Sequence, residues 1–233
     1  MVTPKVQDYL KSIHRLQSDD VPAQSSQIAA EMGVQPPTVT TMLQRLSEDG
    51  LVEYERYRGA RLTPDGERQA LAVLRNHRLL ERFLTEYLGY DWSNVHDEAD
   101  VLEHYISEKF ADRIAELLGY PVTDPHGAPI PTRDLEIPRG SPQYSVDQCR
   151  EGDVVVVSEV RNSSSDVLTY LSNAGVTLGA TLEIVEVAPF GMITVEVRGT
   201  GDQLSLPTDT AVNIYVARPG ESAVAAEQLS EMS

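Results

Sequence analysis

Over the first half of the chain, apolar residues recur three and four positions apart, a period that predicts amphipathic helices. The first such pattern opens at Pro4 and ends near residues 18–20, with an apolar face made of Val6, Tyr9, Leu10, Ile13 and Leu16. A shorter helix is predicted over residues 26–31, with Ser25 as its N-terminal cap and Gly33 as its stop.

A third helix and a hairpin follow. The helix opens at Gln35-Pro36-Pro37, since proline is accepted in a first turn, and it ends before Gly50. Residues 51–63 then form a short hairpin pattern that turns around residues 58–60. Helix, helix-turn-helix and hairpin in this order predict a winged helix-turn-helix, which we assign to residues 1–64.

Two longer helical patterns come next. One starts at Thr63 or Asp65 and runs to about Leu88, and the other spans roughly residues 95–118. The second pattern is apolar over a broader surface than one small domain needs to cover. Residues 65–122 are therefore expected to form a helical domain, and part of the second helix is expected to form a homodimer seam.

The remaining chain changes character. Residues 123–147 are rich in Pro, Gly and Asp and predict a linker. Strand-like runs then lie in the segment 148–218, at residues 153–160, 180–187, 192–197 and 211–216. Short strands at this spacing predict a small barrel. The polar, alanine-rich tail, 219–233, is expected to be disordered.

Charge is distributed unevenly along the 233 residues, whose formal net charge is -17. Residues 1–70 hold 8 basic against 10 acidic side chains, whereas residues 71–233 hold 11 against 26. Such an acidic excess repels polyanions, so nucleic acid is expected to bind only the near-neutral first part. The many arginines and few lysines resemble the composition of proteins from salt-loving archaea.

Cysteine use and hydropathy indicate a cytoplasmic protein without a membrane partner. The single cysteine, Cys149, excludes an internal disulfide and fits a reducing compartment. No apolar run approaches the length of a membrane span, and the N-terminus has no apolar signal-peptide core.

The predicted third helix and hairpin carry the candidate DNA-binding residues. Short polar side chains that can reach base edges and thymine methyls lie on the helix, together with the residues at its N-terminus. Arginines on the hairpin can reach phosphate or the minor groove. The set is Gln35, Pro36, Pro37, Thr38, Thr40, Thr41, Gln44, Arg45, Arg56, Arg58 and Arg61. A winged helix used for protein contact is the alternative.

The segment 96–104 is polar where a helix would normally be apolar. On a helix, one face would carry His96, Asp100, Glu103 and His104. One helix earlier, His77 and Glu81 are four positions apart. Nitrogen and oxygen donors without sulfur suit Mn²⁺, Fe²⁺ or Zn²⁺, so these residues predict a transition-metal site. Solvated ion pairs are the alternative.

With a winged helix, then His77-Arg78-Leu79-x-Glu81, then His96-Asp97-Glu98-Ala99-x-x-x-Glu103-His104, the chain resembles the diphtheria-toxin repressor family of metal-dependent regulators. The resemblance continues through Asp124-Pro125-His126 into a C-terminal SH3-like domain of the FeoA type. It implies an α+β multidomain fold and a homodimer. It also implies a repressor whose affinity for a palindromic operator at metal-uptake genes rises with metal.

The resemblance also implies a primary metal site of Asp8, His77, Asp100, Glu103 and His104. Asp8 and Asp100 stand where iron-responsive members have Met and Cys, as in the manganese-responsive branch, and carboxylates favour Mn²⁺ or Fe²⁺. One departure is Lys11, at a position where that branch can have a second acid. This lysine argues against a two-metal version of the site.

A second metal site is implied by the same resemblance. Its ligands would be Glu81, His96, Asp124 and His126. Iron-type members add a Glu and a Gln from the SH3-like domain, but the aligned residues here are Ser164 and Val167. Asp166, beside them, is the expected substitute. The alternative is a polar linker with a chance histidine.

Asp8 lies on the DNA-binding unit and the other primary ligands lie elsewhere, so a shared metal would fix their relative orientation. Without metal, the clustered carboxylates are expected to repel. A metallohydrolase is disfavoured because the chain has no His-Glu-x-x-His motif and no candidate nucleophile. No catalysis and no small-molecule substrate are therefore expected. A metal-independent winged-helix regulator whose barrel binds a protein is the remaining alternative.

Overall fold

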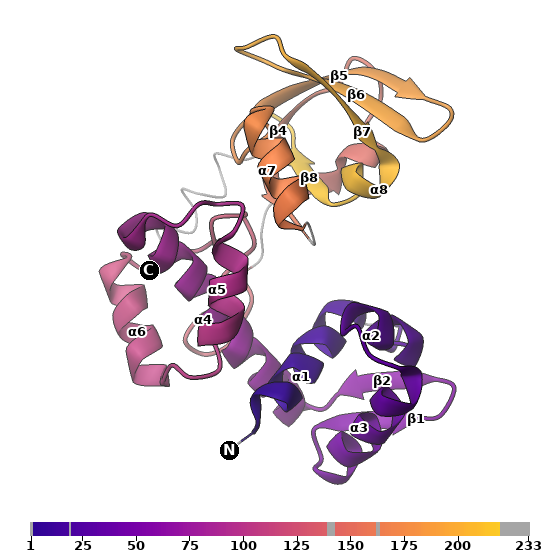
Figure 1. The fold of residues 1–233 in the computed structure, drawn as a ribbon, viewed down its shortest axis with the longest axis vertical. Coiled ribbons are helices and arrows are strands. Elements are labelled where there is room, and N and C mark those ends of the chain that lie inside the picture. Colours follow the sequence, from indigo (N-terminus) through magenta and orange to yellow (C-terminus); the bar gives the residue numbers. More distant parts are fainter. Residues whose placement is uncertain (1, 19, 139–142, 162–163, 220–233) are drawn as a thin grey trace. The chain divides into compact units, whose positions relative to one another are not determined.

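A computed structural model describes residues 2–18, 20–138, 143–161 and 164–219 (Figure 1). It divides into two compact units that interleave along the sequence. Unit 1 comprises residues 1–77, 100–108 and 131–136, and unit 2 comprises residues 78–99, 109–130 and 137–233.

Unit 1 contains the winged helix-turn-helix that the sequence predicts. Its elements are α1 (Pro4–Leu16), α2 (Ser25–Glu31), α3 (Pro36–Glu48), β1 (Val52–Glu55), β2 (Gly59–Leu62) and the first half of α4 (Pro64–Leu88). The fully buried side chains of Tyr9, Leu10, Ile13, Leu43 and Leu46 form the centre of its core. Apolar residues spaced three and four apart on α1 and α3 therefore line a common core, as amphipathic helices require.

The hairpin is tied to the segment that precedes α2. Ala23 and Ala60 exchange backbone hydrogen bonds, both 2.9 Å long, as an antiparallel bridge. Gly59, with φ +103, makes this possible, because a Cβ there would lie 2.5 Å from the Ala23 carbonyl oxygen. The wing is thereby held against the helix-turn-helix.

The predicted helix over 95–118 is wrong, because the structure has two helices there, α5 (Val95–Leu102) and α6 (Glu108–Leu117). Tyr105 N donates to the Leu102 carbonyl in a tight turn, and Asn76 Nδ2 donates to the Glu103 carbonyl at 3.1 Å. A continuous helix would use that carbonyl for its own ladder. The apolar period continues across the break, and sequence spacing alone therefore misses it.

The C-terminal part of unit 2 is a six-stranded antiparallel sheet in the order β3-β8-β4-β5-β6-β7. The strands are β3 (Tyr144–Ser145), β4 (Val154–Val160), β5 (Thr181–Ala188), β6 (Met192–Val197), β7 (Gln203–Pro207) and β8 (Ile214–Ala217). Three short helices accompany them, η1 (Val146–Gln148), α7 (Ser165–Asn173) and α8 (Thr208–Ala211).

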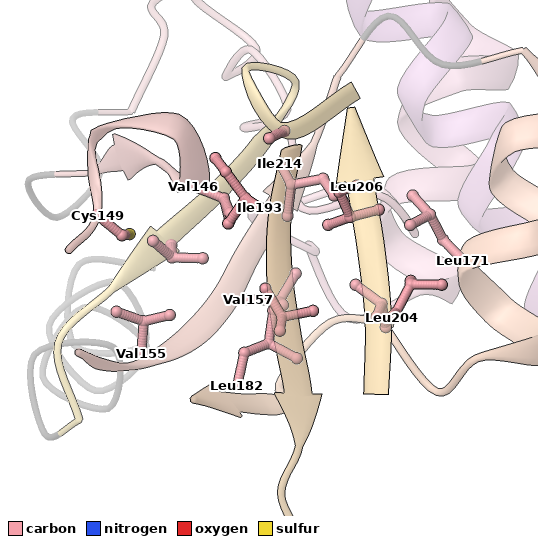
Figure 2. Packing of buried hydrophobic residues seen from close by; sticks show 14 of the residues in the cluster. Val146, Cys149, Val155, Val157, Leu171, Leu182, Ile193, Leu204, Leu206 and Ile214 are labelled. Carbon is pink, nitrogen blue, oxygen red and sulfur yellow. The ribbon is translucent and has the colours of Figure 1, made fainter. Parts of the chain in front are cut away.

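One face of this sheet and α7 enclose a valine- and leucine-rich core (Figure 2). Val155 and Val157 of β4 point into it with Leu204 and Leu206 of β7 (Figure 2). Cys149 is buried at its edge, and this burial raises the pKa of the thiol to about 11. The cysteine is thus a packing residue rather than a reactive thiol.

Two strands of the sheet differ from the sequence prediction. The expected strand at 211–216 begins only at Ile214, since residues 208–211 form α8. The strand β7 was not predicted, because Leu204 and Leu206 are the only two aliphatic side chains among its five residues. Among the described residues, no helix is long and apolar enough to span a bilayer. The tail expected to be disordered lies, from residue 220, outside the described residues.

Candidate metal centres and DNA-binding face

The primary candidate centre lies in unit 1, where α1, α4 and the end of α5 meet. Asp8 Oδ1 lies 3.0 Å from His104 Nε2, and that nitrogen lies 3.4 Å from Glu103 Oε1. His77 Nδ1 lies 2.6 Å from Glu103 Oε2 and 3.3 Å from Asp100 Oδ1. The structure therefore brings together all five residues that the sequence nominates for this site. The break after Leu102 places Glu103 and His104 on a turn instead of a helix face.

The cluster is closed on one side and open on the other. The Glu103 side chain is 0% exposed, whereas Asp100 and Asp8 are 45% and 39% exposed. Burial raises the pKa of Asp8, and the Glu103 and Asp100 carboxylates add to that rise, against the opposing effects of His104 and Lys11. A site with a buried floor and carboxylates at its mouth can admit a hydrated cation.

Gln7, which the sequence did not nominate, orients the His104 ring. Gln7 Oε1 lies 2.7 Å from His104 Nδ1 and accepts a hydrogen bond from it. The lone pair of the ring is then on Nε2, which faces Asp8 and Glu103. Metal-binding histidines usually have their second nitrogen fixed in this way. Two imidazoles with three carboxylates fit Mn²⁺ or Fe²⁺.

Lys11 is part of the same cluster. Its Nζ lies 2.8 Å from Asp100 Oδ1 and 2.7 Å from Glu103 Oε1, and its side chain is 8% exposed. The repulsion expected among metal-free carboxylates is therefore offset from within the chain. The sequence marked Lys11 only as a departure from a family pattern and gave no sign that its ammonium reaches these carboxylates.

The second candidate centre lies in unit 2. Glu81 on α4, Asp124 and His126 are all buried, and each offers a ligand atom within 4.8 Å of the others. His96 Nδ1 lies 2.9 Å from Glu81 Oε1, and His126 Nδ1 lies 3.7 Å from it. These are the four residues that the sequence nominates for the second site.

Hydrogen bonds within the segment 124–128 position two candidate ligands, Asp124 and His126. Asp124 Oδ1 accepts hydrogen bonds from the backbone N–H groups of His126 and Ala128, at 2.8 and 3.0 Å. His126 Nε2 donates to the Trp92 carbonyl at 2.9 Å, which leaves Nδ1 free to face Glu81. The Val160 N–H of β4 donates to the His126 carbonyl at 2.9 Å. Residues 124–128 of the expected linker therefore form an ordered loop joined to the sheet.

In the second centre, the carboxylates of Asp124 and Glu81 are opposed by the positive charges of Arg78 and His126. Burial raises the pKa of Asp124 to about 6, with Glu81 adding to the rise and Arg78 and His126 opposing it. Burial pushes the pKa of His126 down, but the hydrogen bond and charge of Glu81 outweigh it, so the pKa is raised. A divalent cation would relieve the crowding of Asp124 against Glu81.

We expect the metal-free protein to lose stability as the pH rises from about 4 to about 6, because Asp124 is protonated more readily in the folded than in the unfolded state. At 1.4 kcal/mol per pKa unit, the contribution is on the order of 2–3 kcal/mol. Denaturant unfolding in chelator, followed by Trp92 fluorescence, measures it. Asp124→Asn should flatten the profile, and Asn at the exposed Asp209 should not. A profile unchanged by Asp124→Asn would contradict the assignment.

Three further residues surround the second centre and were not found from sequence. Arg78 Nε lies 3.6 Å from Asp124 Oδ2. Glu159 is 3% exposed on β4 and pairs with Arg161 through two contacts of 2.6 and 2.7 Å. A register shift between Val157 and Glu159 turns this carboxylate inward. A lone glutamate in the apolar run Val154–Val160 was the available signal.

Asp166 is the one nominated ligand that the structure keeps apart. It is exposed in the first turn of α7, and it belongs to none of the ligand groups among the described residues. Ser164 instead caps α7, accepting a hydrogen bond from Val167 N at 3.4 Å. The sheet meets the loop 124–128 at β4, through the hydrogen bond from Val160 N to the His126 carbonyl.

The nominated helix face of α3 is exposed, apart from Thr40, which is half-buried. The hydroxyls of Thr40 and Thr41 donate to the Pro36 and Pro37 carbonyls, at 3.2 and 3.1 Å. Those two side chains therefore present methyls and acceptor oxygens outward instead of donors. Thymine-methyl contact suits such a surface.

On the wing, the three nominated arginines differ. Arg56 stacks over the Tyr57 ring, 5.0 Å from its centroid, and Tyr57 is 87% exposed at φ +70. Arg58 pairs with Glu55 at 3.1 Å, and Arg61 donates to the Ser18 carbonyl at 2.9 Å. Arg61 therefore supports the wing itself, while Arg56 and Tyr57 are at its tip. Tyr57 was missed because nothing in its spacing sets it apart.

A winged helix whose first helix contributes a carboxylate to a carboxylate–imidazole cluster is the arrangement of a metal-responsive DNA-binding protein. The comparisons agree: residues 1–60 match the iron dependent repressor N-terminal DNA binding domain, residues 63–132 match its metal binding and dimerisation domain, and residues 144–218 match the FeoA domain. The chain belongs to the iron- and manganese-dependent transcriptional repressor family, as its sequence motifs indicated.

Relatives match over most of the chain. The iron-dependent repressor IdeR of Mycobacterium tuberculosis is 32% identical, covering 90% of this chain and 95% of the relative. The diphtheria toxin repressor of Corynebacterium diphtheriae is 34% identical, with coverages of 76% and 83%. A manganese-dependent transcriptional repressor solved with manganese superimposes with a TM-score of 0.84 at 37% identity, covering 91% of this chain and 99% of that one. ScaR with bound Zn²⁺ gives 0.79 at 32%, with coverages of 91% and 99%.

Proposed function

We propose that this protein is a homodimeric repressor that binds a palindromic operator at metal-uptake genes when Mn²⁺ or Fe²⁺ occupies the primary centre. The observation that carries the proposal is the position of Asp8. It lies on the first helix of the DNA-binding unit, and it is 3.0 Å from His104 on the segment that follows α5. A ligand set shared in this way couples metal binding to the placement of the winged helix.

The residues of the primary centre would act as a clip. Asp8, His77, Asp100, Glu103 and His104 would hold the ion, and a bound divalent ion supplies the positive charge that draws carboxylates together. Asp8 would then fix α1 against the segment 100–104. In a dimer, fixing both winged helices matches two recognition helices to half-sites one helical turn apart. Without metal, the winged helix is no longer fixed in the orientation that fits the operator, and operator affinity falls.

The second centre would have a different task. Glu81, His96, Asp124 and His126 all belong to unit 2, so an ion there would stabilise that unit rather than connect it to α1. Asp166 is not proposed as a ligand, because it is exposed and outside the ligand groups of the described residues. We expect metal at this centre to stiffen the loop 124–128 against the sheet.

The donors of the primary centre favour Mn²⁺ or Fe²⁺ over copper or zinc. Asp8 and Asp100 offer hard oxygens, with imidazole nitrogens as the only softer donors of the primary centre. The names of the relatives include both iron-dependent and manganese-dependent repressors. The protein would act in the cytoplasm on double-stranded DNA, without a catalytic role, a membrane partner or a small-molecule substrate.

A mobility shift with operator fragments tests the proposal. We expect binding with Mn²⁺ or Fe²⁺, little binding in chelator, and loss of the metal effect in Asp8→Ala, by about 30-fold or more if the lost ligand is worth about 2 kcal/mol. Asp97→Ala is the matched control, since Asp97 is an exposed carboxylate on α5. Equal binding with and without metal would overturn the proposal in favour of a metal-independent regulator.

A further inference from the structure

The primary centre contains a cation that belongs to the chain. Lys11 Nζ lies 2.7 Å from Glu103 Oε1 and 2.8 Å from Asp100 Oδ1, and its side chain is almost fully buried. Burying a lysine is costly unless its ammonium is paired and hydrogen-bonded. Here it has two carboxylate partners, both of them nominated metal ligands.

The ammonium uses the same atoms that a metal would need. Glu103 Oε1 is shared between Lys11 Nζ and His104 Nε2, at 2.7 and 3.4 Å. Asp100 Oδ1 is shared between Lys11 Nζ and His77 Nδ1, at 2.8 and 3.3 Å. A divalent ion approaching both imidazoles would therefore meet oxygens already engaged by the lysine.

The charge count makes this competition consequential. Asp8, Asp100 and Glu103 supply three negative charges and Lys11 supplies one positive charge, which leaves a net of -2 with neutral imidazoles. One divalent ion brings that sum to zero. A second would leave an excess of two positive charges in a partly buried site, which is unfavourable.

We propose that Lys11 is a built-in cation of the primary centre. It holds Asp100 and Glu103 in place when no metal is bound, it gives up at least one of them when a divalent ion enters, and it limits the centre to a single ion. Metal binding is then an exchange of one cation for another, and Lys11 sets the metal concentration at which the repressor responds. This inference rests on the proposed function of the same centre.

The substitution Lys11→Met should strengthen Mn²⁺ binding but lower the thermal stability of the metal-free protein. Mn²⁺ affinity, measured by calorimetry and by paramagnetic resonance, should tighten by about tenfold or more, because a positive charge a few ångströms from the ion is gone. In chelator, the thermal midpoint should fall by about 4 °C or more, because Glu103 loses a buried partner. A merely structural lysine would weaken both.

The controls use the same helix. Lys5→Met removes an exposed lysine from α1 and should leave both quantities unchanged. Lys11→Gln, which keeps a hydrogen-bond donor without charge, serves if the methionine variant does not fold, and it should also tighten Mn²⁺ binding. Binding stoichiometry in both Lys11 variants should stay at or rise above the wild-type value for this centre.

The outcomes separate the two proposals. If the wild-type centre takes up Mn²⁺ but neither Lys11 variant binds it more tightly, the built-in cation is overturned and the metal-dependent repressor stands. If affinity and thermal midpoint fall together, Lys11 is a structural residue and the inference is again overturned. If Mn²⁺ does not bind the wild-type centre, both proposals fail.

Discussion

Glu103→Gln should weaken Mn²⁺ binding at the primary centre by about two powers of ten or more and abolish metal-dependent operator binding. Glu103 is the only carboxylate of that centre whose side chain is 0% exposed, and its two oxygens face His77, His104 and Lys11. The amide keeps the shape of the side chain but removes the charge at the floor of the site. Calorimetry with Mn²⁺ and a mobility shift measure the two effects.

The matched control is Glu108→Gln, which changes an exposed carboxylate a few residues further along. That variant should bind Mn²⁺ and operator like the wild type. Circular dichroism of Glu103→Gln in chelator separates loss of ligand from loss of fold. Wild-type Mn²⁺ affinity in a folded Glu103→Gln would remove Glu103 from the centre and contradict the proposed clip.

Gly127→Ala should lower the free energy of unfolding of unit 2 by about 3 kcal/mol or more and weaken metal binding at the second centre. Gly127 has φ +91, and a Cβ there would lie 2.1 Å from the Ser158 carbonyl oxygen. The loop would have to leave β4, which would take Asp124 and His126 away from Glu81. Denaturant unfolding followed by Trp92, whose ring lies 5.1 Å from that of His126, measures the loss.

Gly119→Ala provides the comparison. Gly119 also has a left-handed backbone, with φ +71, but a Cβ there would meet nothing within 4 Å. Only the backbone strain should appear, at about 1–2 kcal/mol. Similar losses in the two variants would mean that contact between Gly127 and β4 has no energetic weight.

Most helices and strands, and most candidate metal ligands, could be predicted from the sequence. Apolar spacing reports which face of a helix is buried, and it placed α1, α2, α3 and the hairpin within a few residues. Histidines and carboxylates at helical spacing nominated both clusters, since few structural roles bring such residues together. Among the described residues, nine of the ten nominated ligands fall in groups that could hold a metal ion, and His96 is tied to the second cluster by its contact with Glu81.

The features that the sequence did not predict depend on contacts between residues distant in sequence. The ion pairs of Lys11 connect residues about ninety positions apart, and the inward turn of Glu159 depends on a register shift in β4. The break after Leu102 is stabilised by Asn76, which lies on another helix. Arg61 looked available for DNA and is engaged by the Ser18 carbonyl. Local periodicity carries no information about these partners.

The hydrogen bond from Val160 N to the His126 carbonyl bears on how such repressors can be shortened. A chain ending before residue 143 would keep all nine ligands that we propose for the two centres, yet its loop 124–128 would lose the strand to which it is attached. The primary centre, built wholly from unit 1, does not share this dependence. A truncated protein would therefore keep an intact primary centre but lose the geometry of the second centre. Domain loss in descendants of this gene should be accompanied by decay of Asp124 and His126.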